Sequence, residues 1–312
     1  MTGVQTSVSL FRRTANDIGI QLQVTVLIPA YNEEQAIIRV LEEVSAVMES
    51  TNYRYEVLVV DDASTDATAQ LAEEFSVTCW ESPVRVIRRP FNAGAGAARK
   101  TGIRAARGEF VVMLDADGSY AASSIPELLK YIPDYDQVNG ARIGEAGTYP
   151  WLRGPAKWAI RKLACYLTGK QIPDLNTGLK VVKRDVVNRF LWVIPDGFSC
   201  VTTMTLAFLS NGYAVKYVEV PYRSRIGISK FHPIKDTASY ISTVLRMVMY
   251  FQPLKVFFPL AFMSMVAGLA KGVWSFRVTG SLQESDVIIL VGSFLTAMLG
   301  LLAEIIVAHH RR

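Results

Sequence analysis

Residues 55–66 read Tyr-Glu-Val-Leu-Val-Val-Asp-Asp-Ala-Ser-Thr-Asp, a short apolar run that ends in two aspartates. Such a run, bounded by turn residues, is typical of a strand that is buried on both faces of a sheet. Similar runs at residues 24–28, 84–87 and 110–114 are separated by segments with helical spacing of apolar residues. We therefore predict a parallel α/β sheet with helices on both faces.

The segments between the predicted strands have the patterns of covering helices. After the first strand, apolar residues recur at helical spacing at Ile37, Val40, Leu41, Val44, Val47 and Met48. We expect Ser64 to cap a second helix and residues 96–106 to form a third, Ala-rich helix. Gly94 and Gly96 at its start favour close helix–strand packing over phosphate binding. They do not complete a dinucleotide-binding fingerprint, because Arg99 occupies the place of its third glycine.

The composition separates the 312 residues into two unlike parts. Half of the residues are hydrophobic and 20% are charged, which excludes a disordered, collagen-like or disulfide-scaffold chain. Residues 1–220 carry 23 basic and 24 acidic residues, whereas residues 221–312 carry 10 and 4. The excess positive charge therefore lies in the last third. The three cysteines show no metal or redox spacing, so we expect buried thiols in a reducing compartment.

The last third has the pattern of a membrane anchor. We predict an amphipathic interfacial helix over residues 233–252 and a transmembrane hairpin over residues 253–312, with spans at 256–270 and 287–308 joined by about ten residues. The second span has 22 residues with one charge, Glu304, and about 20 residues cross a bilayer. A buried hairpin of a soluble protein is the alternative.

The remaining limits and the orientation follow from the same pattern. Residues 1–22 are predicted to be a loosely ordered or membrane-lying arm and residues 23–232 the catalytic domain. Two histidines and two arginines follow the second span. By the positive-inside rule, the C-terminus and the large domain are expected on the cytoplasmic side of the membrane.

Polar clusters follow three of the predicted strands, at residues 29–33, 61–64 and 115–117. The carboxyl ends of parallel strands form the ligand-binding edge of such a sheet. Asp115 and Asp117, two residues apart just past a strand, could approach one divalent ion, and their hard oxygen ligands suit Mg²⁺ or Mn²⁺. Solvated turn aspartates are the alternative for this pair, but three clusters at successive strand ends favour a site.

Seven stretches together resemble a known family: residues 28–34, 60–66, 92–96, 114–118, 140–142, 174–178 and 225–230. The chain resembles the family 2 glycosyltransferases with the GT-A fold. Within them it is similar to the polyprenyl-phosphate glycosyltransferases, the group that includes dolichyl-phosphate mannose synthase. The resemblance implies a Rossmann-like, mixed and mostly parallel sheet, and a two-span hairpin follows the catalytic domain in some members.

The resemblance also implies roles for single residues. The residues implied to bind the nucleotide-sugar are Pro29, Ala30, Tyr31, Glu33, Asp62 and Asp115. The implied ligands of a Mg²⁺ or Mn²⁺ ion are Asp115, Asp117 and Ser119. Relatives carry Gln in place of Ser119, and a purely structural role in the turn is the alternative for this serine. The acceptor phosphate falls to Arg142, Arg153 and Lys157, for which solvated surface charge is the alternative. Asp117, Arg225 and Lys230 would be catalytic, the last two in a loop that closes on phosphates or merely contacts the membrane surface.

The implied activity is inverting transfer of one sugar from a GDP- or UDP-sugar to a polyprenyl or dolichyl phosphate at a lipid bilayer. A lipid phosphate is already an anion, so it can attack without a general base, and alignment and charge neutralisation become the main tasks. The alternatives are a polysaccharide or glycolipid acceptor, a sugar nucleotidyltransferase and a non-catalytic membrane scaffold. Nucleic acid is not an expected partner, and the hairpin could support a homo-oligomer.

Overall fold

The structure is a computed structural model that describes residues 23–78, 83–143, 161–166, 168–197, 199–226, 242, 245–247 and 249–310. The predicted arm at residues 1–22 and most of the predicted interfacial helix at 233–252 lie outside these residues. So do three predicted site residues, Arg153, Lys157 and Lys230. The chain forms two compact units, Met1–Lys157 with Ile172–Asp236, and Trp158–Gln171 with Thr237–Arg312. The domain limits drawn from the sequence remain predictions.

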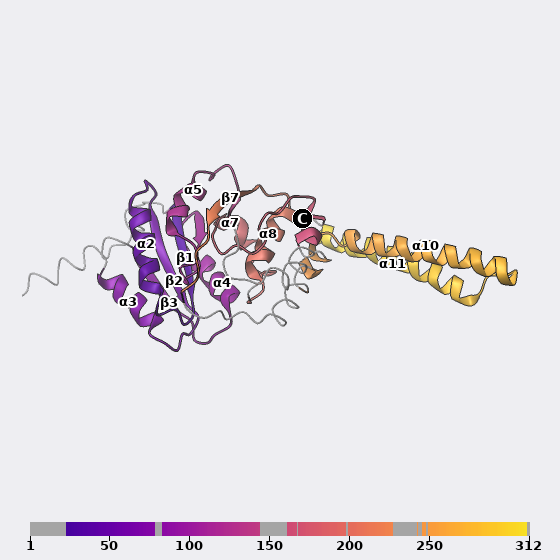
Figure 1. The fold of residues 1–312 in the computed structure, drawn as a ribbon, viewed down its shortest axis with the longest axis horizontal. Helices are drawn as coiled ribbons and strands as arrows, with labels where there is room; N and C mark the ends of the chain where they lie inside the picture. Colours follow the sequence, from indigo (N-terminus) through magenta and orange to yellow (C-terminus); the bar gives the residue numbers. More distant parts are fainter. Residues whose placement is uncertain are drawn as a thin grey trace, which may run out of the picture. The chain divides into compact units, whose positions relative to one another are not determined.

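The first unit contains a sheet of seven strands in the order β3-β2-β1-β4-β6-β5-β7 (Figure 1). The strands are β1 Val24–Ala30, β2 Tyr55–Asp61, β3 Val84–Arg88, β4 Phe110–Met113, β5 Gln137–Ile143, β6 Lys180–Lys183 and β7 Val215–Pro221. β1 is parallel to β2 and β4, β2 is parallel to β3, and β5 is parallel to β7. β6 is antiparallel to β4 and β5. The predicted mixed, mostly parallel sheet is confirmed.

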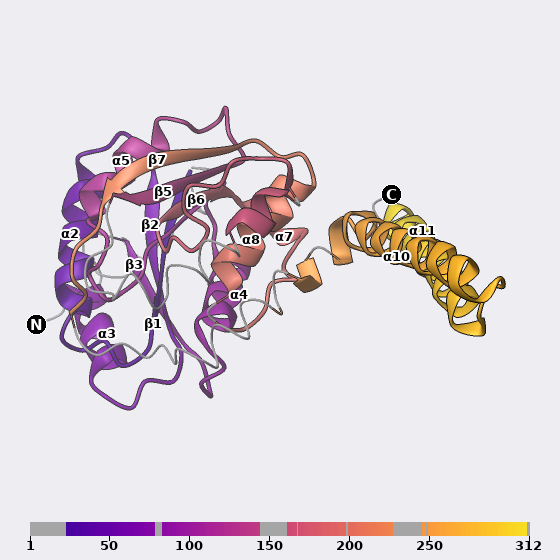
Figure 2. The same cartoon turned by 45° about the vertical axis from the view of Figure 1, so that its right-hand side comes forward.

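Helices cover both faces of this sheet (Figure 2). They are α2 Ile37–Glu49, α3 Thr68–Thr78, α4 Ala95–Ala105, α5 Ile125–Leu129, α7 Arg184–Asn188 and α8 Cys200–Ser210. α2, α3 and α5 lie on one face, and α4, α7 and α8 lie on the other. The predicted face of α2 is buried, with Ile37 and Leu41 fully inaccessible, because strands with apolar residues on both sides need a cover on each face.

Two local expectations were wrong. Ser64 does not cap α3, which begins at Thr68; its Oγ instead accepts a hydrogen bond from the backbone N–H of Asn32 at 2.9 Å. The close helix–strand contact is made by Gly102 and not by Gly94 and Gly96 at the start of α4. A Cβ at Gly102 would lie 2.1 Å from Cδ1 of Leu27 in β1, so only a glycine lets α4 approach the sheet this closely.

The direction of β6 decides what gathers at the binding edge. Because β6 is antiparallel to β4 and β5, its first residue lies at the edge where those two strands end. The segment that precedes β6, with Asp174 and Gly178, is therefore carried to the carboxyl ends of β4 and β5. This brings residues about 60 positions apart in the sequence next to one another: the backbone N–H of Gly178 donates to the hydroxyl of Tyr120 at 3.0 Å.

Lys180, the first residue of β6, is fully buried. Its Nζ donates to the carbonyl oxygen of Val201 at 2.9 Å and to Oγ1 of Thr205 at 3.0 Å. Burial lowers the pKa of Lys180 to about 7. Between this pKa and its ordinary value of 10.5, the unfolded chain binds more protons than the folded chain. The free energy of unfolding should therefore rise with pH across that window.

Lys180→Met should flatten this rise, because the substitution removes the proton that only the unfolded chain takes up. The measurement is urea unfolding of the detergent-solubilised chain at several values between about pH 7.5 and 9. Lys183→Met is the matched control on the same strand, because Lys183 is partly exposed and pairs with Asp136 at 3.2 Å. Equal slopes for the Lys180 variant and the unchanged chain would contradict the buried-amine explanation.

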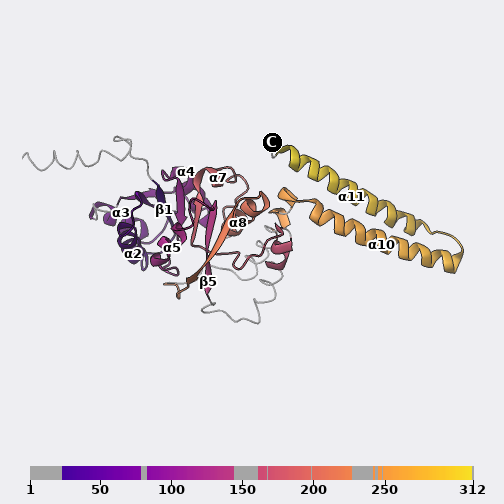
Figure 3. The ribbon, with the colours of Figure 1, turned by 90° about the horizontal axis from the view of Figure 1, so that it is seen from above.

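The second unit contains two long antiparallel helices, α10 Leu254–Thr279 and α11 Glu284–His310, which lie side by side (Figure 3). Glycines allow their close contact: a Cβ at Gly268 would lie 2.9 Å from Cγ2 of Ile289, and one at Gly300 would lie 2.6 Å from Cβ of Phe257. Both helices are long and apolar enough to cross a membrane, and most of their side chains are exposed. Helices are present at both predicted spans, but they extend further than expected, so four residues join them instead of about ten.

Candidate active site

Three polar clusters predicted from the sequence lie at the ends of three adjacent strands, β2, β1 and β4. The backbone N–H of Asp62 donates to the carbonyl oxygen of Ala30 at 2.9 Å, which joins the first two clusters. The N–H of Leu114 donates to the carbonyl oxygen of Leu27 at 3.1 Å, which brings the third cluster beside the first. The sheet therefore gathers all three at one edge.

The loops after β1 and β2 are tied together by side chains. The backbone N–H of Thr65 donates to Oδ1 of Asn32 at 2.8 Å, and the N–H of Glu33 donates to Oγ1 of Thr68 at 2.7 Å. Asn32 and Ala63 both have positive φ angles, 51° and 59°. Such a conformation is costly for alanine and persists where surrounding contacts enforce it. The loops that carry the predicted nucleotide-binding residues are thus held in one defined arrangement.

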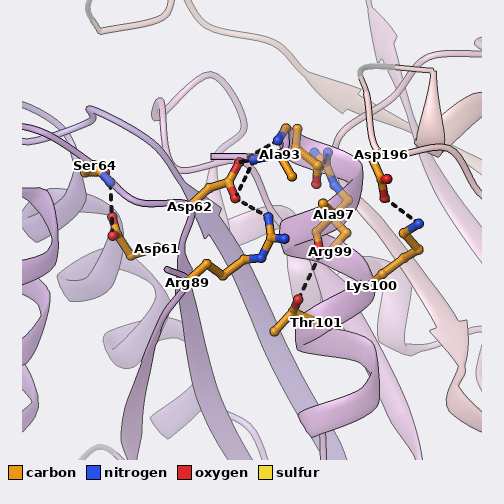
Figure 4. Close-up of polar contacts among 12 residues, drawn as sticks. Asp61, Asp62, Ser64, Arg89, Ala93, Ala97, Arg99, Lys100, Thr101 and Asp196 are labelled. Atoms are coloured by element: carbon orange, nitrogen blue, oxygen red, sulfur yellow. Dashed lines mark hydrogen bonds and ion pairs between the residues drawn. The ribbon is translucent and has the colours of Figure 1, made fainter. Parts of the chain in front are cut away.

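Asp62 is 2% exposed and connects β2 to the segment before α4 (Figure 4). Its carboxylate forms an ion pair with Arg89 and accepts hydrogen bonds from the N–H of Gly94 at 2.7 Å and of Ala93 at 3.3 Å. Both carboxylate oxygens are therefore engaged within the chain. The neighbouring Asp61 accepts from the N–H of Ser64 at 3.1 Å. The predicted contact of Asp62 with a nucleotide would add to these internal bonds.

Gly94 and Gly96, at the start of α4, pack against a loop. The carbonyl oxygen of Asp196 accepts hydrogen bonds from the N–H of Gly96 at 2.7 Å and of Ala97 at 3.1 Å. A Cβ at Gly96 would lie 2.1 Å from the carbonyl oxygen of Pro195. The expected helix–strand packing of Gly94 and Gly96 is therefore replaced by contact with the backbone of this loop. The carbonyl oxygen of Asp196 therefore accepts hydrogen bonds from backbone N–H groups that could otherwise bind an anion at the helix N-terminus.

Gly96→Ala should destabilise the chain by about 1–3 kcal/mol, the usual cost of overpacking, because the added methyl group meets rigid backbone. Thermal unfolding of the detergent-solubilised chain measures the change. Gly197→Ala is the control, because no atom lies within 4 Å of the Cβ that it would add. A Gly96 variant as stable as the Gly197 variant would show that the loop yields freely.

Asp115 is held between a cation and a glycine. Its Oδ1 forms an ion pair with Nη2 of Arg99 on α4. Its Oδ2 occupies the space over Gly178, where a Cβ would lie 2.0 Å from that oxygen. The carboxylate therefore has one fixed orientation at the end of β4.

Asp117 is paired with a cation from the segment after β7. Its Oδ2 lies 2.9 Å from Nη2 of Arg225, whose side chain is 41% exposed. The N–H of Ser119 donates to Oδ1 of Asp117 at 3.0 Å, and the N–H of Ile226 donates to the carbonyl oxygen of Asp117 at 3.0 Å. Two residues predicted to be catalytic, Asp117 and Arg225, are thus in direct contact. The predicted metal ligand Ser119 is buried beside them.

Arg142, the predicted acceptor-phosphate residue at the end of β5, forms a two-pronged ion pair. Its Nε and Nη2 donate to the two carboxylate oxygens of Asp174 at 2.7 and 2.9 Å, and its guanidinium lies 5.3 Å from the ring centre of Tyr222. Burial alone would raise the pKa of Asp174, but the hydrogen bonds and charge of Arg142 outweigh it and hold that pKa below its ordinary value. An acceptor phosphate that approached Arg142 would find its guanidinium already paired with Asp174.

Sequence reasoning missed the pairing of Arg99 with Asp115 and the contact of Gly178 with the same carboxylate. A signal for Arg99 was available. It lies three residues after Gly96 and four before Ile103, on the buried face of an Ala-rich helix. A charged residue on such a face almost always has a partner.

Among the described residues, no three His, Cys, Asp or Glu side chains gather as metal ligands.

Comparison with known families gives two matches. The model described as "Glycosyl transferase family 2" matches residues 25–191, and the model described as "GtrB C-terminal hairpin" matches residues 252–308. The first match covers the sheet from β1 to β6 and the helices between its strands. The second covers α10 and nearly all of α11.

Curated proteins of similar sequence include a dolichyl-phosphate hexose transferase of Haloferax volcanii. It is 31% identical over 223 residues, which are 71% of this chain and 92% of that protein. A dodecaprenyl-phosphate galacturonate synthase of Rhizobium johnstonii is 30% identical over 60% of this chain, and the match spans 55% of that protein.

A similar solved structure is glucosyl-3-phosphoglycerate synthase of Mycobacterium tuberculosis in complex with Mn²⁺, UDP-glucose and phosphoglyceric acid. The TM-score is 0.57 at 18% identity, over 73% of this chain and 80% of that chain. At this identity the likeness is one of fold.

Proposed function

The chain belongs to glycosyl transferase family 2, and on this basis we propose that it transfers one sugar from a nucleotide-sugar donor to a polyprenyl phosphate at a membrane surface. The resemblance found in the sequence motifs is confirmed, and the protein is a glycosyltransferase. The observation that carries the proposal is the combination of two features in one chain. A family 2 domain with acidic side chains at its binding edge is followed by two apolar helices that match a hairpin family.

The donor site is proposed at the edge formed by β2, β1 and β4. Pro29, Ala30, Tyr31, Glu33 and Asp62 would hold the nucleoside, since they lie in or beside the two cross-linked loops. Those loops are bonded to each other before any ligand binds. The chain therefore need not order them on binding, which saves conformational entropy. Support for a diphosphate nearby comes from the half-exposed Arg225 on Asp117.

The residues present fit a divalent ion. Asp115 and Asp117 supply hard carboxylate oxygens, and the missing side chain of Gly178 leaves room for the Asp115 carboxylate. Mg²⁺ typically takes one or two protein carboxylates together with substrate phosphates and water, so two carboxylates suffice. A Mg²⁺ or Mn²⁺ ion held there would offset the charge that develops on the leaving nucleoside diphosphate. Ser119 remains a predicted further ligand.

Arg225 and Arg142 are proposed to bring the two anionic substrates together. Arg225 is half-exposed and pairs with Asp117, so it can exchange that carboxylate for a donor phosphate. Arg142, with the predicted residues Arg153 and Lys157, would hold the acceptor phosphate, and Lys230 would act beside Arg225. The acceptor oxygen would attack the anomeric carbon in line with the leaving diphosphate, which inverts the configuration at that carbon.

The proposed location is a membrane crossed twice, with the catalytic domain and the C-terminus on the cytoplasmic side. The basic residues after α11 support this orientation by the positive-inside rule. A polyprenyl phosphate has its charged head at the membrane surface, where a domain anchored by α10 and α11 can reach it.

A panel of radiolabelled GDP- and UDP-sugars tests the function. Membranes that contain the chain are incubated with each sugar and with added polyprenyl phosphate. Chloroform-extractable label is expected with one donor, and it should be absent from membranes that contain the Asp117→Ala variant. Label that is found solely in water-soluble products would contradict a lipid phosphate acceptor and favour a polysaccharide synthase or a nucleotidyltransferase.

A further inference from the structure

Arg99 is a buried cation that the reaction scheme above does not use. It is 5% exposed and lies in α4, yet its guanidinium reaches the end of β4 and pairs with Asp115. Its Nη1 lies 3.3 Å from Sγ of Cys200, the first residue of α8. Arg99 therefore joins α4 to α8 and to the end of β4, where it meets a predicted donor-site carboxylate.

The two arginines of the site differ in how freely they can leave their carboxylates. Arg225 is 41% exposed, so its guanidinium can move into water or onto a phosphate. Arg99 is enclosed between α4 and α8, and a guanidinium stays charged at all relevant pH values. Breaking its pair with Asp115 would leave a buried cation without its counter-ion, which is strongly unfavourable. The Arg99–Asp115 pair should therefore persist when donor and metal bind.

Asp115 is fixed from its other side as well. Gly178 lies against Oδ2, and the N–H of Gly178 is itself bonded to the hydroxyl of Tyr120 at 3.0 Å. With Oδ1 on Arg99 and Oδ2 over Gly178, the carboxylate cannot rotate without losing one of these contacts. The geometry of its ligands is thus set before substrate arrives, which is the condition for efficient alignment.

We propose that Arg99 is a positioning residue that fixes the Asp115 carboxylate for the donor and its metal ion. This inference rests on the proposed function. Arg99 does not touch the substrates; it acts by orienting Asp115 and by supplying a permanent counter-charge. Loss of Arg99 is expected to weaken metal binding, although removal of a positive charge by itself would strengthen the attraction of a cation. This difference in sign separates orientation from simple charge repulsion.

The test uses the full chain in detergent, with Mn²⁺ binding measured by electron paramagnetic resonance and with kcat and KM for the donor sugar. Arg99→Gln should weaken Mn²⁺ binding at least about 10-fold and lower kcat by up to about 10²-fold. Arg99→Lys keeps the charge and should restore part of both. Lys100→Gln is the matched control, because the next residue of α4 pairs with Asp196 and not with Asp115, and its values should match the unchanged chain.

A second substitution guards against a folding defect. Gly178→Ala pushes the same carboxylate from the opposite side and should also weaken Mn²⁺ binding, whereas Cys200→Ala keeps the Arg99–Asp115 pair and should change it less than about 3-fold. Both Mn²⁺ binding and kcat are compared per folded molecule. The inference would be overturned if both are unchanged or increased in Arg99→Gln.

The outcomes also separate the inference from the function on which it rests. Normal Mn²⁺ binding with no lipid-linked product from any donor would overturn the proposed function, while the Mn²⁺ affinities would still decide the role of Arg99. Transfer activity without Mn²⁺ binding would overturn the metal role, and the kcat values would decide. A chain that shows neither would overturn both.

Discussion

Asp117→Ala is expected to lower transfer by at least about 10²–10³-fold, the loss typical of removing one charge-stabilising group from an active site. Asp117 lies in the turn after β4, where its Oδ2 meets Arg225 and its Oδ1 accepts the N–H of Ser119. The substitution removes a proposed metal ligand and also frees Arg225. Two functions of the site are therefore lost together, while the sheet keeps all of its strands.

This variant should still fold, since the hydrogen bond and the half-exposed ion pair that it loses contribute about 1 kcal/mol each. Thermal unfolding checks this. Asp117→Asn retains the oxygen that accepts the N–H of Ser119 but removes the negative charge, so it separates the effect of the turn hydrogen bond from the effect of the charge. Asp134→Ala, at an exposed aspartate, is the control and should be fully active. Full activity of Asp117→Ala in the presence of EDTA would refute the metal role of this residue.

Gly178→Ala should reduce kcat by about 10²-fold, because a shift of about 1 Å in a reacting group has this effect. The added Cβ would lie 2.0 Å from Oδ2 of Asp115 and 3.1 Å from Cε2 of Tyr120. The Tyr120 ring is packed edge-on against Tyr222 at 5.2 Å, so it has little room to move. The carboxylate must therefore turn away from its place between Arg99 and Gly178.

The expected effect of Gly178→Ala is on activity far more than on stability. Asp115 is partly exposed at the end of β4, and a displacement of Oδ2 that leaves Oδ1 paired with Arg99 keeps the buried cation neutralised and the core intact. Kinetics with the donor sugar and thermal unfolding measure the two quantities in the same preparation. Gly197→Ala, where the new methyl group meets no atom within 4 Å, should leave both unchanged. Equal activity of the two variants would mean that Asp115 is not held as the structure indicates.

The parallel core could be predicted from the sequence because each of its strands is a local pattern. β1, β2 and β4 are apolar runs buried on both faces. β2 and β4 end within one residue of the predicted limit, and β1 ends two residues beyond it. The acidic clusters follow directly, since a parallel sheet gathers the carboxyl ends of its strands. Family resemblance added the mixed character of the sheet, which no single run shows.

The partners of the site residues could not be predicted, because they depend on contacts between distant segments. Arg99 and Asp115 are brought together by packing of α4 beside β4, and Gly178 arrives through the antiparallel β6. The loop at Asp196, which meets the glycines at the start of α4, has no periodic pattern of apolar residues. Arg142 stays a predicted acceptor-phosphate residue, and its ion pair with Asp174 could not be foreseen, because it required both strand ends to be placed.

The α10–α11 hairpin has a consequence for how the chain enters a bilayer. If both helices cross together, their short turn must pass through the hydrocarbon, where an isolated charge costs about 2.5–3.5 kcal/mol on insertion scales. The turn end carries two cations, Lys271 and Arg277, and two anions, Glu284 and Asp286. Lys271 Nζ lies 2.6 Å from Oδ1 of Asp286, whose side chain is fully enclosed. The turn end is therefore electrically neutral and partly paired, whereas residues 309–312 are two histidines and two arginines, so the two ends of the hairpin differ in the charge that a bilayer would meet.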